Sequence, residues 1–259
     1  MRTIEGQIVP RLLMARGTVS AAVTARERTE GGTPIGREQV AELIRLLLLH
    51  DSAVSSAFIS DLRQHGTSVE RICLSLLAPA ARELGEMWER DDVDVIQVTL
   101  GLCRLQTLLR EISADSTQET GDRTVHGSIL LVPELGEQHT FGLQLVGEFF
   151  RRAQWDVWME QPESAAALLE LVAREHFSVI GLTVGCEERL PGLATRITSV
   201  RRASRNRALC VMVGGPLFLA KPELAASVGA DATASDGHLA VAMATTLTNA
   251  RSQAHGAQA

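Results

Sequence analysis

The sequence contains no tyrosine, few aromatic residues of any kind, and a single lysine, Lys221, among many arginines. Its formal net charge is −6 at pH 7, so no chain-wide excess of positive charge favours nucleic-acid binding. No apolar run approaches the roughly 18 residues that a membrane-spanning helix needs. The N-terminus lacks an apolar signal core as well. We therefore expect a cytoplasmic protein that does not enter a membrane.

Cysteine is scarce, and the positions of the cysteines exclude several kinds of site. Cys73, Cys103, Cys186 and Cys210 form no CxxC pair, which is typical of reduced, mostly buried thiols. No cluster of cysteine and histidine has the spacing of a zinc site. No GxxxxGK[ST] motif occurs, and no GxGxxG follows an expected strand, so neither a P-loop nor a dinucleotide site is predicted.

The first half of the chain predicts an arm followed by helices. The length of 259 residues suits one large or two modest domains. Residues 1–36 mix arginines with short apolar patches and end in a Gly- and Pro-containing stretch, which predicts a flexible N-terminal arm. Docking to a partner is the alternative role for this arm. Over residues 37–113, apolar residues recur at helical spacing in four segments with short links, which predicts an up-down four-helix bundle.

The second half predicts an α/β domain. Residues 114–125 are polar and predict a linker. Residues 126–250 alternate short apolar runs with helical stretches, as repeated βα units do. The expected strands are Ser128–Pro133, Asp156–Met159, Val179–Thr183, Leu209–Val213 and Asp231–Ala234. The expected helices are Phe141–Arg152, Glu163–His176, Arg189–Arg202, Pro222–Val228 and Gly237–Asn249. This pattern predicts a five-stranded parallel sheet of flavodoxin-like order, followed by a disordered tail at 251–259.

One motif follows the first expected strand and precedes a helix. In open α/β sheets, ligands bind at this edge. Glu137, His139 and Gly142 have the spacing Glu-x-His-x-x-Gly there. The spacing resembles the Asp-x-His-x-x-Gly motif of cobalamin (vitamin B12) binding domains. A metal-bound imidazole usually donates its second N–H to a carboxylate, which fixes the tautomer and raises the basicity of the ligand.

The resemblance implies a role for each residue of this motif. His139 would ligate cobalt from the lower face of the corrin, in place of the dimethylbenzimidazole base. Glu137 would orient the imidazole, and Gly142 would let the nucleotide tail pass close to the backbone. Glutamate is one methylene longer than the aspartate of the family, so the geometry of this pair can differ. The other loop residues that we assign to the cofactor are Gln138, Thr140 and Phe141.

Later strand ends resemble the tail-binding motifs of the same family. Thr183-Val-Gly185 resembles Ser-x-Leu, whose hydroxyl bonds the displaced base, with glycine in place of leucine. Gly214-Gly215 resembles the turn that lets the nucleotide loop approach the backbone, because glycine has no Cβ. Asp236 or Ser235 could cap the last helix and face the tail. The residues assigned here are Thr183, Val184, Gly185, Gly214, Gly215, Pro216 and Asp236.

A second resemblance lies in the helical region. Leu84-Gly85-Glu-Met-Trp88 resembles the Leu-Gly-x-x-Trp segment of the helical cap that precedes cobalamin domains. In that cap the indole covers the upper face of the corrin. Gly85 and Trp88 share one helix face, and the glycine leaves room beside the ring. Photoreceptor relatives often carry Glu-His shortly after the tryptophan, where this chain has Val98-Thr99, so no upper cobalt ligand is predicted from the bundle.

A cap joined to a cobalamin domain fits more than one function, and no further catalytic domain is evident, so we expect no enzyme. A regulator would use cobalamin as a sensing group, often for light, because the cobalt–carbon bond is photolabile. A corrinoid carrier would shuttle methyl groups between methyltransferases. A storage or delivery protein is the third alternative. The cofactor is cobalamin in each case, with the hydroxo, adenosyl and methyl forms not distinguished.

The motif neighbourhoods favour the regulator. Glu134-Leu-Gly-Glu-Gln-His-Thr-Phe-Gly-Leu143 and Thr183-Val-Gly-Cys-Glu-Glu188 look most like the AerR/PpaA antirepressors of photosynthetic bacteria. Carriers more usually have Ile-Gly-Lys after the motif, where this chain has Phe141-Gly-Leu-Gln. The resemblance implies relief of repression of photosynthesis genes through association with a PpsR/CrtJ-type repressor. Any DNA contact would then run through that partner or through the N-terminal arm.

Overall fold

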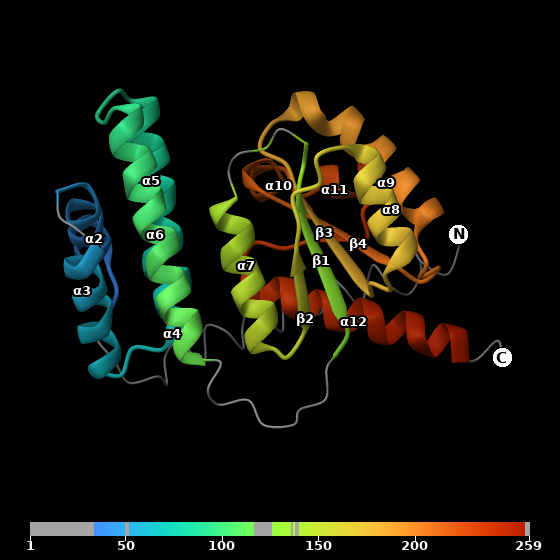
Figure 1. The fold of residues 1–259 in the computed structure, drawn as a ribbon, viewed down its shortest axis with the longest axis horizontal. Coiled ribbons are helices and arrows are strands. Elements are labelled where there is room, and N and C mark those ends of the chain that lie inside the picture. The colour runs from blue at the N-terminus through green and yellow to red at the C-terminus, as the bar shows by residue number, and fades with distance from the viewer. Residues whose placement is uncertain (1–33, 50–51, 117–125, 136, 138–139, 257–259) are drawn as a thin grey trace. The chain divides into compact units, whose positions relative to one another are not determined.

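The computed structural model describes residues 34–49, 52–116, 126–135, 137 and 140–256 (Figure 1). These residues belong to two compact units, a helical one up to residue 116 and an α/β one from residue 126. Most of the predicted arm, the predicted linker from residue 117 and the end of the predicted tail lie outside the described residues, as do Gln138 and His139. Across the described ranges, no helix has the length and apolar character that crossing a membrane requires.

The helical unit contains the four predicted helical segments. Leucine and isoleucine side chains at helical spacing form its core, and α2 packs against α3, α5 and α6. The elements are α2 (Arg37–Leu49), α3 (Ser52–Gln64), α4 (Val69–Ile72), the π-helical turn η2 (Cys73–Leu77), α5 (Ala78–Glu89) and α6 (Val95–Ser116). Helix α6 thus continues past residue 113, where the sequence predicted the end of the bundle.

The third segment runs through α4, η2 and α5 and contains a π-helical turn. The Ala78 N–H bonds to the Cys73 carbonyl, five residues back, and Pro79 follows with no N–H of its own. The helix is therefore distorted just before Pro79, as a π-helical turn. Because that turn holds an extra residue, it changes which face of α5 meets the core. Leu84 is fully buried on that face, whereas Trp88 is 48% exposed.

The α/β unit is a five-stranded parallel sheet in the order β2-β1-β3-β4-β5, which confirms the predicted flavodoxin-like architecture. Its strands are β1 (Ser128–Pro133), β2 (Asp156–Met159), β3 (Val179–Thr183), β4 (Cys210–Gly214) and β5 (Ala232–Thr233). Its helices are α7 (Phe141–Arg152), α8 (Ala165–Arg174), the 3₁₀ turn η4 (Glu187–Arg189), α9 (Leu190–Ala203), α10 (Pro216–Ala220), α11 (Leu224–Ser227) and α12 (Gly237–Gly256).

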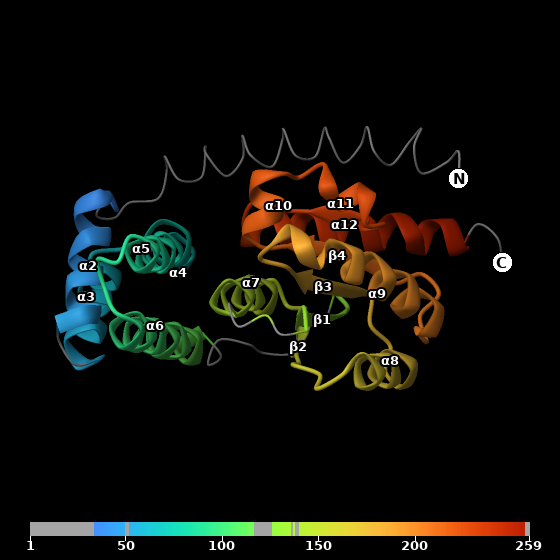
Figure 2. The same ribbon diagram turned by 90° about the horizontal axis from the view of Figure 1, so that it is seen from above.

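Helices cover both faces of the sheet because its side chains alternate between two apolar cores. Leu130, Ile180 and Val211 pack with α8, α9 and α10 on one face. Ile129 and Val179 pack with α7 and α12 on the other. Figure 2 shows the strands between α7 on one side and α8 and α9 on the other.

Several element bounds differ from the prediction. Strand β4 is shifted by one residue, and β5 is limited to Ala232–Thr233. Helix α10, which the sequence analysis missed, begins at Pro216, because proline suits the first turn of a helix. Helix α12 continues to Gly256 rather than ending at Asn249. One reason is that Arg251, in the last turns of α12, bonds to the Asp231 carboxylate and to the Leu209 carbonyl.

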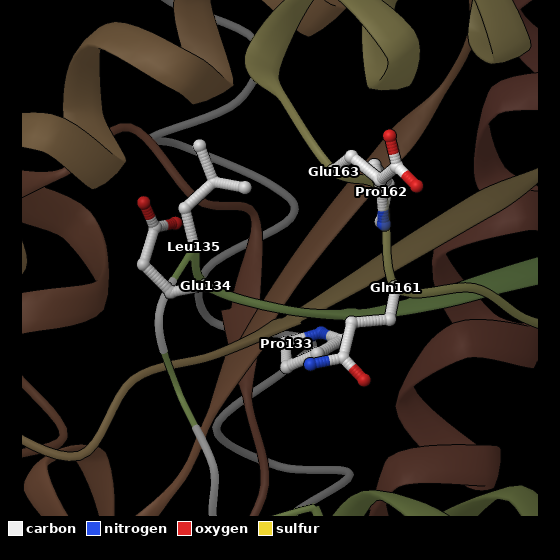
Figure 3. Close-up of a pocket in the computed structure, with 6 residues that line it drawn as sticks. All are labelled: Pro133, Glu134, Leu135, Gln161, Pro162 and Glu163. Atoms are coloured by element: carbon white, nitrogen blue, oxygen red, sulfur yellow. The ribbon is translucent and has the colours of Figure 1, made fainter.

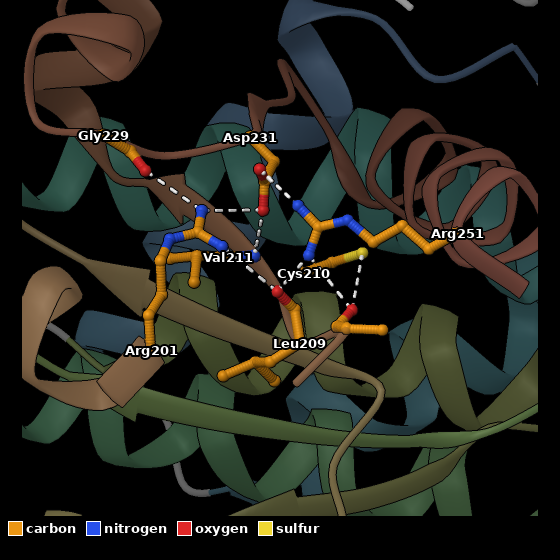
Figure 4. Close-up of polar contacts among 8 residues, drawn as sticks. Arg201, Leu209, Cys210, Val211, Gly229, Asp231 and Arg251 are labelled. Atoms are coloured by element: carbon orange, nitrogen blue, oxygen red, sulfur yellow. Dashed lines mark hydrogen bonds and ion pairs between the residues drawn. The ribbon is translucent and has the colours of Figure 1, made fainter. Parts of the chain in front are cut away.

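These bonds belong to a charged network at the N-terminal edge of the sheet (Figure 4). The carboxylate of Asp231 contacts Arg201 at 2.9 Å and Arg251 at 2.7 Å, and accepts the Val211 N–H at 2.6 Å. The two arginines also donate to the Leu209 carbonyl. The network ties α9 and α12 to β4. Burial raises the pKa of the neighbouring Cys210 thiol to about 11, so this cysteine is not a nucleophile at neutral pH.

Candidate functional site

The loop after β1 carries the predicted cobalt-binding motif, and β3 fixes its first residue. The Glu134 N–H donates to the Thr183 carbonyl at 2.9 Å, which extends the pairing of β1 with β3 beyond the strand. The Glu137 N–H then donates to the Glu134 carbonyl at 2.8 Å and closes a tight turn. Helix α7 begins after Thr140, whose carbonyl accepts the Gln144 N–H at 3.0 Å. The motif therefore sits where the sequence placed it, at the C-terminal edge of the sheet.

Arginines that follow β3 hold the same loop in place. Arg196 pairs with the buried Glu134 carboxylate at 2.7 Å, and Arg189 donates to the Leu135 carbonyl at 3.0 Å. Burial raises the pKa of Glu134, and the charge of Arg196 partly opposes that rise. Sequence analysis missed this set. The available signal was a charged residue, Glu134, directly after a fully apolar strand.

Glu137 connects the loops after β1 and β3. Its side chain is buried, at 6% exposure, and its Oε2 accepts the Gly185 N–H at 3.0 Å. A Cβ built at Gly185 would lie 2.8 Å from that oxygen, closer than real Cβ atoms come. Two predicted site residues therefore meet here. The orientation of His139 by Glu137 stays a prediction, because His139 lies outside the described residues.

Thr183, the last residue of β3, has a buried hydroxyl with no hydrogen-bond partner among the described residues. Leaving a buried hydroxyl unpaired costs about 1–3 kcal/mol, so such groups in native proteins usually have an explanation. The side chain lies on the face of the sheet that α7 and α12 cover, since Val179 occupies the same face of β3. An unpaired hydroxyl at this edge matches a group that bonds a ligand.

The glycines of the predicted site fall into two classes. A Cβ at Gly142 or Gly214 would meet nothing within 4 Å, so both positions leave open space. Gly215 has φ +108°, and a Cβ there would lie 2.4 Å from the Val184 carbonyl oxygen. The chain itself therefore requires glycine at 215. Val184 is fully buried in the core, Phe141 is buried, and Pro216 is exposed at the start of α10.

Asp236 caps α12, as expected. Its Oδ1 accepts the Leu239 N–H at 2.9 Å, and its Oδ2 accepts the Ser235 hydroxyl at 3.0 Å. At the next position, a Cβ on Gly237 would lie 2.3 Å from the Phe149 ring, so α12 packs tightly against α7 there. His238 contributes an edge-to-face contact with the same ring at 4.8 Å.

In the helical unit, Trp88 is about half exposed near the C-terminal end of α5. A Cβ on Gly85 would meet nothing within 4 Å, so the space beside the indole is open. Ile96 and Leu100, at the start of the neighbouring α6, are 65% and 48% exposed. Exposed apolar side chains on two adjoining helices are typical of a binding surface. Sequence analysis singled out Trp88 and missed the other two, although their spacing of four is helical.

A cavity of about 310 Å³ opens beside this edge, between the loops that follow β1 and β2 (Figure 3). Its lining residues are Pro133, Glu134, Leu135, Gln161, Pro162 and Glu163. In Figure 3 the Glu134 carboxylate points away from Gln161. Among the residues that the structure describes, none that we assigned to the cofactor lines this cavity.

Comparison with known families identifies both units. A model of the B12 binding domain matches residues 127–243, and a second model with the same description matches residues 39–102. The chain belongs to the cobalamin-binding domain proteins. An uncharacterised 20.5 kDa protein of Rhodobacter capsulatus, in the bchF-crtJ intergenic region, is 28% identical over 173 residues, 67% of this chain and 90% of that protein. The monomethylamine corrinoid protein of Methanosarcina barkeri shares the fold, with a TM-score of 0.67 at 14% identity over 82% of this chain and 99% of that chain.

The cofactor of this cobalamin-binding protein is therefore cobalamin, and the described residues fit it. Thr183 offers an unpaired buried hydroxyl where the displaced base of the tail would need a partner. Gly142, in the first turn of α7, and Gly214, at the end of β4, leave open space. The Glu137 carboxylate is buried, and a carboxylate is a usual partner for the second N–H of a metal-bound imidazole.

Proposed function

We propose that this cobalamin-binding protein is a light-responsive regulator, an antirepressor that acts by associating with a PpsR/CrtJ-type repressor of photosynthesis genes. The observation that carries the proposal is the Rhodobacter capsulatus relative, whose gene lies between bchF and crtJ. The name crtJ matches the PpsR/CrtJ type of repressor that the motif resemblance implies. One line of support comes from the loops of this chain, and the other from the position of a related gene.

Each assigned residue has a defined task in this proposal. His139 would be a ligand of the cobalt, and Glu137 would accept the second N–H of its imidazole. The Thr183 hydroxyl would bond the base of the nucleotide tail, with Gly142 and Gly214 leaving the tail room. Trp88 would pack against the corrin. The cofactor supplies a photolabile cobalt–carbon bond, and the protein supplies ligation and orientation.

The signal reaches the repressor through the helical unit. Trp88, Ile96 and Leu100 present exposed apolar surface, of the kind that partners cover. A change at the upper face of the corrin alters how this surface is covered. For the repressor to respond, its contacts must differ between the two states, because a partner that binds both equally shifts no equilibrium. We therefore place the repressor-binding surface on the helical unit, and we expect DNA contact only through the repressor or the N-terminal arm.

A corrinoid carrier for methyl transfer is the second candidate. It is favoured by the fold, which the chain shares with a corrinoid protein. The absence of the Ile-Gly-Lys run after the motif, where Phe141-Gly-Leu-Gln stands, argues against it. Either function makes the chain a binder and positioner of cobalamin rather than an enzyme.

Absorption spectroscopy separates these functions. The purified protein is loaded with hydroxocobalamin or adenosylcobalamin, and spectra are taken in the dark and after illumination. His139→Ala tests the lower ligand, and His176→Ala, at an exposed histidine, is the matched control. We expect a light-dependent spectrum that changes with His139→Ala alone, and light-dependent capture of a PpsR/CrtJ-type repressor. Acceptance of a methyl group from a methyltransferase, without repressor capture, would support the carrier. Failure of both cobalamins to stay bound through gel filtration would refute both functions.

A further inference from the structure

Two departures from the motifs of the cobalamin family meet at one point in this structure. The family has aspartate where this chain has Glu137, and leucine where it has Gly185. The two residues are 48 positions apart in sequence, yet the Gly185 N–H donates to Glu137 Oε2 at 3.0 Å. One contact therefore joins both departures.

The distances from a Cβ at position 185 show how closely the Glu137 carboxylate approaches Gly185. A Cβ on Gly185 would lie 2.8 Å from Oε2 and 3.6 Å from the carboxyl carbon of Glu137. Gly185 does not have a positive φ, so its backbone would accept an alanine. The three atoms nearest to this Cβ all belong to the Glu137 carboxyl group, so a side chain at 185 would have to displace that group.

The electrostatic side points the same way. Glu137 is buried, and a buried carboxylate needs hydrogen-bond donors to offset the loss of water. The Gly185 amide is such a donor, and it lies on a loop that the strand β3 holds in place. An aspartate would be one methylene shorter and would draw back from this amide. The Gly185 amide is therefore one of the groups that hold the Glu137 carboxylate in position.

We propose that Gly185 is a positioning residue for the lower cobalt ligand, acting through Glu137. This inference rests on the proposed role of His139 as that ligand. The Gly185 amide anchors the Glu137 carboxylate, and the missing side chain at 185 makes room for the glutamate. Glutamate at 137 and glycine at 185 form one unit, in which a change at one position alters the tolerance for a side chain at the other.

A double-mutant cycle tests this coupling. Wild type, Gly185→Ala, Glu137→Asp and the double variant are each loaded with hydroxocobalamin, and the dissociation constant is measured. The cobalt is then reduced to the divalent state for electron paramagnetic resonance, with histidine labelled by the heavy nitrogen isotope. A protein imidazole on cobalt then gives a doublet splitting in place of the triplet from ordinary nitrogen.

In the glutamate background, we expect Gly185→Ala to weaken binding about tenfold or more and to reduce the histidine doublet. In the aspartate background, the same alanine should change binding less than about threefold and leave the doublet in place. Equal effects of Gly185→Ala in both backgrounds, or no effect in either, would refute the coupling. Absence of the histidine doublet in the wild type would instead refute the proposed ligand.

Controls separate positioning from folding. Gly192→Ala places a Cβ in open space on α9 and should leave binding and the doublet unchanged. Thermal unfolding of each cofactor-free variant shows whether the α/β unit still folds. If Gly185→Ala fails to fold in the glutamate background, Gly185→Ser replaces it in the cycle. Glu137→Asp should then restore cobalamin binding and the histidine doublet to Gly185→Ser. A failure to fold in both backgrounds counts against the coupling.

Discussion

The unpaired hydroxyl of Thr183 gives a prediction with opposite signs for stability and binding. Thr183→Val replaces the hydroxyl by a methyl group of nearly the same size. In the cofactor-free protein this removes a buried polar group that lacks a partner. In the loaded protein it removes the bond that we propose between Thr183 and the displaced base. The substitution should therefore stabilise the cofactor-free protein and lower its affinity for cobalamin.

The magnitudes follow from the cost of unpaired groups. Burying an unsatisfied hydroxyl costs about 1–3 kcal/mol, so Thr183→Val should raise the free energy of unfolding by about 1 kcal/mol. For a unit of this size, that is roughly 3–4 °C in melting temperature. Loss of one hydrogen bond to the cofactor should raise the dissociation constant for hydroxocobalamin by about tenfold. Circular dichroism on heating and equilibrium titration measure the two effects.

Thr233 provides the matched control. Its hydroxyl is also buried without a partner among the described residues. It lies on β5 opposite Val213, on the face of the sheet that α8, α9 and α10 cover. Thr233→Val should stabilise the cofactor-free protein in the same way and leave cobalamin binding unchanged. The reasoning fails if Thr183→Val destabilises the cofactor-free protein, or if the two valine variants bind cobalamin equally.

Three further predictions concern charge and exposure. Burial raises the pKa of Glu134, so its contribution to stability is fully present below the unfolded pKa and is lost as pH rises through the folded pKa. The stability of wild type relative to Glu134→Gln should therefore fall as pH rises above about 4 in urea titrations. Asp231→Ala leaves two partly buried arginines and the Val211 N–H without their carboxylate, and should lower the free energy of unfolding by about 3–5 kcal/mol, measured in the same way. Trp88→Ala removes a half-exposed side chain, so it should change stability by less than about 1 kcal/mol but weaken cobalamin binding in titrations.

Local patterns predicted the fold well where an element is long or strongly apolar. Strands β1, β2 and β3 and helix α7 have the predicted bounds, because a fully apolar run before a turn or an amphipathic helix is visible in the sequence itself. The misses have tertiary causes. Strand β5 is short where Asp231 turns to the arginines of α9 and α12, and α12 extends because Arg251 reaches the Leu209 carbonyl. Neither contact leaves a local signal.

The site shows the same limit more sharply. Spacing within the β1 loop predicted which residues follow the strand, and strand order predicted that the loops after β3 and β4 share its edge. Neither the spacing nor the strand order predicted that Arg196 pairs with Glu134, since these residues are far apart in sequence and belong to different elements. For the same reason, glycine in place of leucine at 185 weakened the match to the family when it was considered alone.

In the structure, that glycine lies against the glutamate. The carboxylate at 137 reaches one bond further than an aspartate would, and its oxygen occupies the space that a side chain at 185 would need. Two mismatches to a motif therefore count as one change when the residues touch. A chain with glutamate at the first position and a bulky residue at the second would lack room for the carboxylate. Such a chain should place its acidic residue differently, or bind cobalamin without an acid-oriented histidine.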